Sequence, residues 1–211
     1  KSGKKFVTDE KTLRAMARAF STFESNAKME VIVAAPTAGS CGIVPAALVT
    51  AAEDLDASDD DLVRGLLTAI GIGQFIAGYG TFAGSEGGCQ AECGAASSMA
   101  AAALAELYGG DVETCLNAAS IAIVNILGLV CDPLGGLVQY PCTFRNASGV
   151  SNARVSADMA LAGTFSIIPF DEVCKAMKEV GDALPASLRE TGIGGLAGTD
   201  TAKTLCGKIF G

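Results

Sequence analysis

The chain has 211 residues, of which 50% are apolar and 18% are charged, and its formal net charge is −8. This length and apolar content predict one folded domain over residues 1–211 and exclude a disordered chain. The acidic balance argues against a nucleic-acid partner, which requires a basic face. No apolar run reaches the roughly 18 to 20 residues of a bilayer span, so we expect no membrane segment.

Helical spacing of apolar residues predicts helices through most of the chain. The first is predicted to begin at Thr8 as N-cap, and Ser58 opens another with a capping-box pattern that ends in Asp61. Residues 31–35 are predicted either as a short strand or as a buried helix end. Further helices are predicted over residues 95–108, from Asp111 to Val124, over 151–161 and over 171–180. The predicted fold class is all-α, a single helical domain.

Glycine-rich breaks separate these helices at residues 36–42, 78–88, 132–145 and 192–198. Glycine allows positive φ angles and a close approach of the backbone to a ligand. We therefore expect these loops to build the functional site.

Eight cysteines accompany no histidine. The chain alone therefore offers no Ser-His-Asp triad, no Cys-His pair and no His-ligated zinc. It begins Lys-Ser-Gly-Lys-Lys, without Met and without a signal-peptide pattern. We accordingly expect a cytoplasmic protein with reduced thiols, and a chain that is a piece of a longer gene product.

The cysteine spacing does not identify a metal. Cys89 and Cys93 would share one face of a helix, and Cys131 and Cys142 flank a turn-rich loop. This is neither the ferredoxin spacing nor the paired spacing of zinc ribbons, and small cysteines also pack as core residues. A metal site, buried core thiols and a zinc- or disulfide-stabilised domain all stay open at this point.

Several longer motifs occur in order along the chain. They are residues 35–45 (APTAGSCGIVP), 84–92 (GSEGGCQAE), 127–138 (LGLVCDPLGGLV), 141–146 (PCTFRN) and 189–197 (RETGIGGLA). Together they closely resemble the α chain of bacterial iron–sulfur L-serine dehydratases of the two-subunit type. The resemblance runs from about residue 10 to the final residues 208–211.

The resemblance implies a [4Fe–4S] cluster held by Cys89, Cys131 and Cys142, and no pyridoxal phosphate. It implies a lyase of amino-acid degradation and gluconeogenesis that converts L-serine to pyruvate and ammonia. An iron with an open position acts as a Lewis acid on the substrate oxygens, and a base removes the α-proton. The implied partners are L-serine and a β subunit in an oligomer. A lyase of threonine or cysteine, and a non-catalytic subunit that binds a partner, are the alternatives.

The loop residues are expected to handle the substrate. Arg145 is predicted to bind a carboxylate through two hydrogen bonds or, alternatively, to pin a loop. Glu86 is predicted to orient a ligand or contact substrate, with capping of the following helix as the alternative. The predicted catalytic residues are Glu86, Arg145 and Asn146, and the predicted substrate-binding residues are Thr37, Ser40 and Asn125.

The chain also departs from the family pattern. Residues 81–86 read Thr-Phe-Ala-Gly-Ser-Glu where the family commonly has Ser-Ile-Ser-Gly-Ala-Glu. The upstream glycine-rich segment with its histidine, which family α chains carry, is not found. We therefore expect the general base to lie outside this chain.

Overall fold

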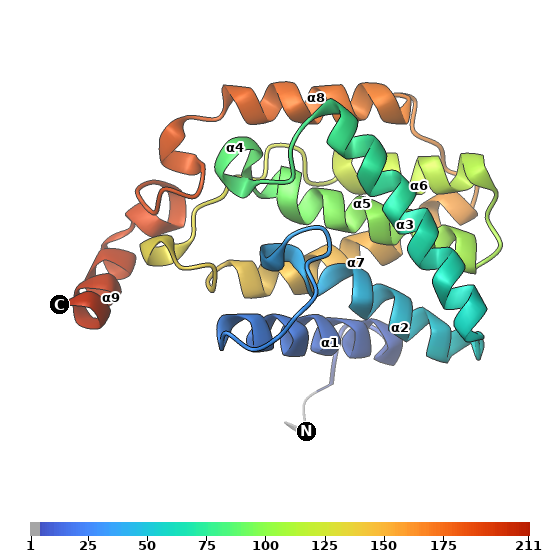
Figure 1. The fold of residues 1–211 in the computed structure, drawn as a ribbon, viewed down its shortest axis with the longest axis horizontal. Helices are drawn as coiled ribbons and strands as arrows, with labels where there is room; N and C mark the ends of the chain where they lie inside the picture. The colour runs from blue at the N-terminus through green and yellow to red at the C-terminus, as the bar shows by residue number, and fades with distance from the viewer. Residues whose placement is uncertain (1–4) are drawn as a thin grey trace.

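The computed structural model describes residues 5–211, which pack as helices around a central helix, α5 (Ala95–Leu107) (Figure 1). These residues contain no strand, only one isolated bridge between Cys131 and Arg189. The predicted all-α class is confirmed. The other α-helices are α1 (Glu10–Ala27), α2 (Ile43–Leu55), α3 (Asp59–Tyr79), α4 (Gly84–Cys89), α6 (Val112–Val124), α7 (Cys142–Leu161), α8 (Phe170–Ala183) and α9 (Asp200–Phe210).

Helix α5 is buried on every side from Ala95 to Ala105. A helix that is apolar all round belongs in a core, and its many alanines let neighbouring helices approach closely. It contacts α2, α3, α6 and α7. The start of α5 therefore offers a rigid, central platform.

Two predicted helix starts are confirmed by their caps. The Ser58 side chain accepts a hydrogen bond from the Asp61 amide at 3.2 Å, and Asp61 accepts one from the Ser58 amide at 2.9 Å. Asp111 accepts a hydrogen bond from the Thr114 amide at 2.9 Å and caps α6. These starts are local features, so the sequence alone could reveal them.

Other predictions are corrected. The N-cap of α1 is Asp9, not Thr8, because the Asp9 carboxylate reaches the Thr12 amide at 2.9 Å. Residues 31–35 are neither strand nor buried helix end: the segment is irregular, and Val31 and Val33 are exposed. Helix α7 begins at Cys142 rather than at residue 151. Helices α2, α4 and α9 were not predicted, and α4 begins within the predicted break at residues 78–88.

Helix α3 has 21 residues and a mean hydropathy of 1.3 over its most apolar window, the length and composition of a helix that could cross a membrane. Core helices of soluble proteins pass the same test, but they are mostly buried, whereas 28% of this window is buried. Here α3 packs against α2, α5 and α8.

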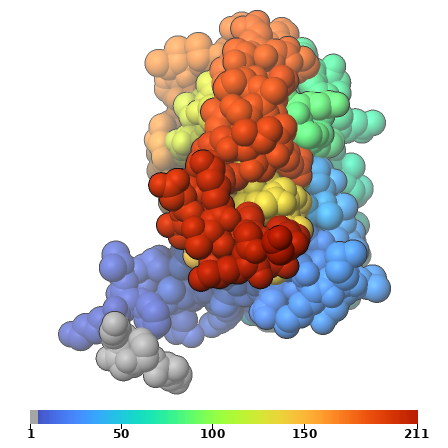
Figure 2. Space-filling view, turned by 90° about the vertical axis from the view of Figure 1, so that its left-hand side faces the viewer, coloured from blue at the N-terminus to red at the C-terminus, as the bar shows by residue number. Residues whose placement is uncertain are grey.

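Short helical turns join the long helices near one end of α5. They are η1 (Ala38–Ser40), the π-turn η2 (Gln90–Gly94), η3 (Leu134–Gly136), η4 (Ala186–Leu188) and η5 (Gly195–Gly198). Helix α9 packs against η3 and η5. Figure 2 shows these C-terminal residues, in red, lying over the loop near residues 130–140, in yellow.

Candidate metal centre

The site forms where α4 turns into α5. Gly88 has φ +75°, and a Cβ there would lie 2.8 Å from the Leu129 carbonyl oxygen, so both conformation and space require glycine. The π-turn η2 follows directly. Single π-turns of this kind occur frequently at functional sites.

Buried Gln90 fixes this turn to its neighbours. Its Nε2 donates to the Met177 carbonyl oxygen at 2.9 Å, and its Oε1 accepts from the Gly128 amide at 2.8 Å. The Gln90 amide also donates to the Leu129 carbonyl oxygen at 2.9 Å. Gln90 therefore holds Cys89 beside the segment that leads to Cys131.

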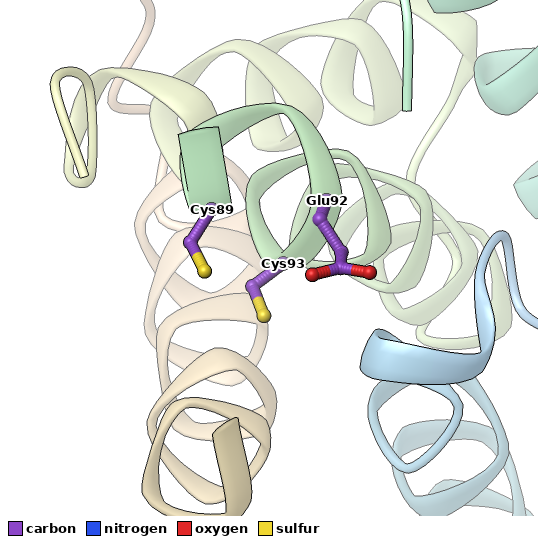
Figure 3. Close-up of side chains that lie close together, drawn as sticks. All are labelled: Cys89, Glu92 and Cys93. Atoms are coloured by element: carbon purple, nitrogen blue, oxygen red, sulfur yellow. The ribbon is translucent and has the colours of Figure 1, made fainter. Parts of the chain in front are cut away.

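Cys89, Glu92 and Cys93 point into the same space (Figure 3), and their ligand atoms all lie within 4.8 Å of one another. The Cys131 thiol hydrogen bonds to Cys89 as well. The backbone holds Cys131 in place, since its amide donates to the Leu188 carbonyl oxygen at 2.9 Å and its carbonyl oxygen accepts from the Glu190 amide at 2.7 Å.

Cys142, the first residue of α7, packs with Phe23 and Cys41 in a small buried cluster. The negative charge of Cys89 contributes to raising the pKa of Cys142, so the two thiols interact electrostatically. All eight cysteines of the chain are free thiols, and only Cys206 is not buried.

Hydrogen bonds within this thiol cluster separate the thiol pKa values. Donation from Cys131 and Cys93, aided by the Arg145 charge, lowers the pKa of Cys89 to about 3. The pKa values of Cys131 and Cys93 are raised, first by their hydrogen bonds to Cys89 and then by burial. Burial raises the pKa of Cys142 to about 12. Cys89 is therefore the thiolate of the group, the form that binds metals.

Both Nη atoms of Arg145 donate hydrogen bonds to groups inside the protein. One Nη atom donates to Asp132 Oδ1 at 2.7 Å, and the other donates to the Val130 carbonyl oxygen at 2.9 Å and to Cys89 Sγ at 3.3 Å. Arg145 was predicted to bind a substrate carboxylate through two hydrogen bonds, but in the structure one of its Nη atoms binds the Asp132 carboxylate instead. The structure favours the loop-pinning alternative.

Asn146 is likewise buried and saturated. Its Oδ1 accepts from the Gly42 amide at 3.0 Å, and its Nδ2 donates to the carbonyl oxygens of Gly39 at 2.8 Å and Cys142 at 2.9 Å. Asn146 therefore ties the loop at residues 36–42 to the start of α7, which carries Cys142.

Hydrogen bonds connect Thr37 and Ser40 to Glu92, which lies beside the thiols. Thr37 caps η1, and its hydroxyl lies 2.6 Å from Glu92 Oε1 and 2.9 Å from the Ser40 hydroxyl. A Cβ on Gly39 would lie 2.4 Å from Glu92 Oε1, so only glycine leaves room for this carboxylate. The predicted site residues did not include Glu92, although its spacing from Cys89 already put both on one helix face.

Two predicted residues lie elsewhere. Glu86 is exposed and lines a separate cavity with Lys178, Asp182 and Arg189. Asn125 is exposed and donates to Asn152 on α7, which lies about 15 Å along that helix from Cys142 at 1.5 Å per residue. The structure does not bring these two side chains to the thiols.

The chain matches the family model described as "Serine dehydratase alpha chain" over residues 1–197. It is 63% identical over 204 residues to "L-serine dehydratase, alpha chain" of Peptoniphilus asaccharolyticus, covering 97% of this chain and 70% of that protein. It is 51% identical to "Probable L-serine dehydratase, alpha chain" of Bacillus subtilis (strain 168), covering 94% and 66%. It is 42% identical to "L-serine dehydratase 1" of Escherichia coli (strain K12), covering 85% and 40%.

Proposed function

The chain belongs to the serine dehydratase alpha-chain family, and on that premise we propose that it carries the catalytic site of an L-serine dehydratase. The expected enzyme class, a lyase of L-serine, is the one that its relatives' names state. The chain spans 70%, 66% and 40% of the three relatives' lengths, so the activity of the whole enzyme is part of the proposal. The observation that carries it is the buried thiol group at the start of α5.

We propose that Cys89, Cys131 and Cys142 hold a [4Fe–4S] cluster. Three observations support the proposal: thiolates are the usual ligands of such a group, all three thiols are buried, and Cys131 and Cys142 each interact with Cys89, by a hydrogen bond and through its charge respectively. Gly84 adds space, because a Cβ there would lie 2.9 Å from Cys131 Sγ. When bound, the cluster would supply an iron with an open position as a Lewis acid for the substrate hydroxyl and carboxylate oxygens.

The other residues of the site hold this arrangement in place. Arg145 donates to Cys89 and pairs with Asp132, and Asn146 joins two loops. Both act by positioning. Thr37 lines the cavity beside Glu92, and the buried Ser40 hydroxyl lies 2.9 Å from the Thr37 hydroxyl. We propose that the base that removes the α-proton lies outside this chain.

The name "alpha chain" in its relatives implies a second chain. We propose a β chain as partner in a cytoplasmic oligomer that binds neither nucleic acid nor a membrane. Threonine or cysteine as substrate, and a non-catalytic role, are the alternatives.

The test uses the chain loaded anaerobically with iron and sulfide and combined with the β chain of its own organism. We expect pyruvate from L-serine, at a higher kcat/KM than for L-threonine or L-cysteine, and none from Cys131→Ala. A cluster-bearing complex that forms no pyruvate would refute the activity. A preference for threonine or cysteine would replace serine as the substrate.

A further inference from the structure

A cavity of about 500 Å³ opens beside the thiol group. Two carboxylates, Glu92 and Glu190, line it together with Thr37, Asn26 and Gln139, and no lysine or arginine is among its lining residues. A cavity with this charge repels anions and attracts a cationic group. Its occupant is therefore expected to present a positive charge.

Glu92 is the deeper of the two carboxylates. It is 8% exposed, and it forms no ion pair within residues 5–211. Its Oε1 accepts from Thr37 at 2.6 Å, whereas Oε2 accepts no hydrogen bond from the described residues and keeps contact with solvent. Burial raises the pKa of Glu92 to about 7. A buried carboxylate is costly unless a cation or further donors satisfy it.

Glu190 faces the same cavity from the other side. Its backbone has φ +63°, a conformation that is uncommon outside glycine. Two backbone contacts hold it there: its amide donates to the Cys131 carbonyl oxygen at 2.7 Å, and its carboxylate accepts from the Ser85 amide. The strained residue thus links the cavity to a predicted cluster ligand.

We propose that Glu92, with Glu190 beside it, binds the α-ammonium group of L-serine. The inference rests on the proposed function and adds to it a basis for selecting amino acids over hydroxy acids. An ammonium group supplies three donors, which suit the free Glu92 Oε2 and a second carboxylate. The same cavity offers no cation for the substrate carboxylate.

The test compares two ligands that differ only in the amino group, L-serine and 3-hydroxypropanoate. Their dissociation constants are measured by rapid mixing, from the cluster absorbance before any L-serine turns over, on the cluster-loaded chain with its β chain, for wild type, Glu92→Gln and Glu179→Gln. Gln keeps the shape of Glu92 and an oxygen for Thr37. Glu179 is an exposed residue of α8 outside the cavity, and serves as matched control.

In Glu92→Gln we expect the Kd of L-serine to rise by at least about tenfold, since a hydrogen-bonded charge is lost. The Kd of 3-hydroxypropanoate should change by less than about twofold, and the bound iron should equal that of Glu179→Gln. Glu190→Gln should shift serine binding in the same direction by a smaller factor, and it tests the inference if Glu92→Gln does not fold.

Unchanged serine affinity in both variants would overturn the inference, as would an equal loss for both ligands or a loss of iron in Glu92→Gln alone. Wild-type protein that binds L-serine but forms no pyruvate would refute the proposed function and leave the ammonium site standing. Wild-type protein that does not bind L-serine would refute both.

Discussion

Arg145 and Asp132 form an ion pair at 2.7 Å, with side chains 13% and 4% exposed. Asp132 Oδ2 also accepts from the Leu196 amide at 2.7 Å, so the pair joins α7, the loop after Cys131 and η5. Arg145→Met would leave the Asp132 carboxylate buried without its cation. We expect this to lower the unfolding free energy by about 3–5 kcal/mol, the usual cost of removing one partner from a buried pair.

A double-mutant cycle separates the pair from its surroundings. In Asp132→Asn the amide oxygen still accepts a hydrogen bond from Arg145 or Leu196, so the cost should be lower, about 2–3 kcal/mol. The double variant should be less damaging than the sum of the single variants, with a coupling energy of about 2 kcal/mol. The exposed pair Lys175–Asp171 is the control, with an expected coupling of at most about 0.5 kcal/mol.

The assay is urea unfolding of the reduced, cluster-free protein, followed by circular dichroism. Single-variant costs that add to within about 0.5 kcal/mol would show that Arg145 and Asp132 act independently. That result would refute the argument that Arg145 is held by Asp132, and Arg145 would again be a candidate for binding a substrate carboxylate.

Two further perturbations probe the space and charge around the thiols. Burial raises the pKa of Glu92 from 4.5 to about 7, so the folded protein binds this proton more tightly than the unfolded chain. Relative to Glu92→Gln, wild-type stability should therefore be greatest below pH 4.5 and fall by about 3 kcal/mol as the pH rises to about 7.5; parallel stability curves for the two proteins in urea unfolding would contradict this. Gly84→Ala should lower the amount of iron bound after reconstitution, because its Cβ would lie 2.9 Å from Cys131 Sγ. The control is Gly78→Ala in α3, whose Cβ would meet nothing within 4 Å. This control should raise the unfolding free energy by about 0.5–1 kcal/mol and leave the bound iron unchanged. Equal iron in both glycine variants would contradict the steric argument.

The features that could be read from the sequence were those fixed by neighbouring residues. The caps at Ser58 and Asp111 each depend on a side chain three residues from the amide that it meets. The start of α7 at Cys142 could not be found this way, because residues 142–151 show little apolar periodicity and are ordered by contacts with α1, α5 and η1.

The site residues also divide into those that neighbouring residues in the sequence fix and those that only the folded chain fixes. The motif at residues 84–92 contains both Glu86 and Glu92, but only the backbone turn at Gly88 decides which carboxylate faces the thiols. The sequence pointed to Glu86, whereas the carboxylate beside the thiols is Glu92. The engagement of Arg145 by Asp132 was similarly invisible, since it depends on how the loop after Cys131 folds back on α7.

The central claim, that Cys89, Cys131 and Cys142 hold the cluster, is tested most directly by counting iron after anaerobic reconstitution with iron and sulfide. Single alanine variants of these three cysteines would be compared with Cys93→Ala and with Cys115→Ala, a buried thiol in α6. The account predicts about four irons per chain in wild type, Cys93→Ala and Cys115→Ala, and loss of iron in the other three. Iron kept by Cys131→Ala and lost by Cys93→Ala would contradict it and indicate a site made by Cys89, Glu92 and Cys93.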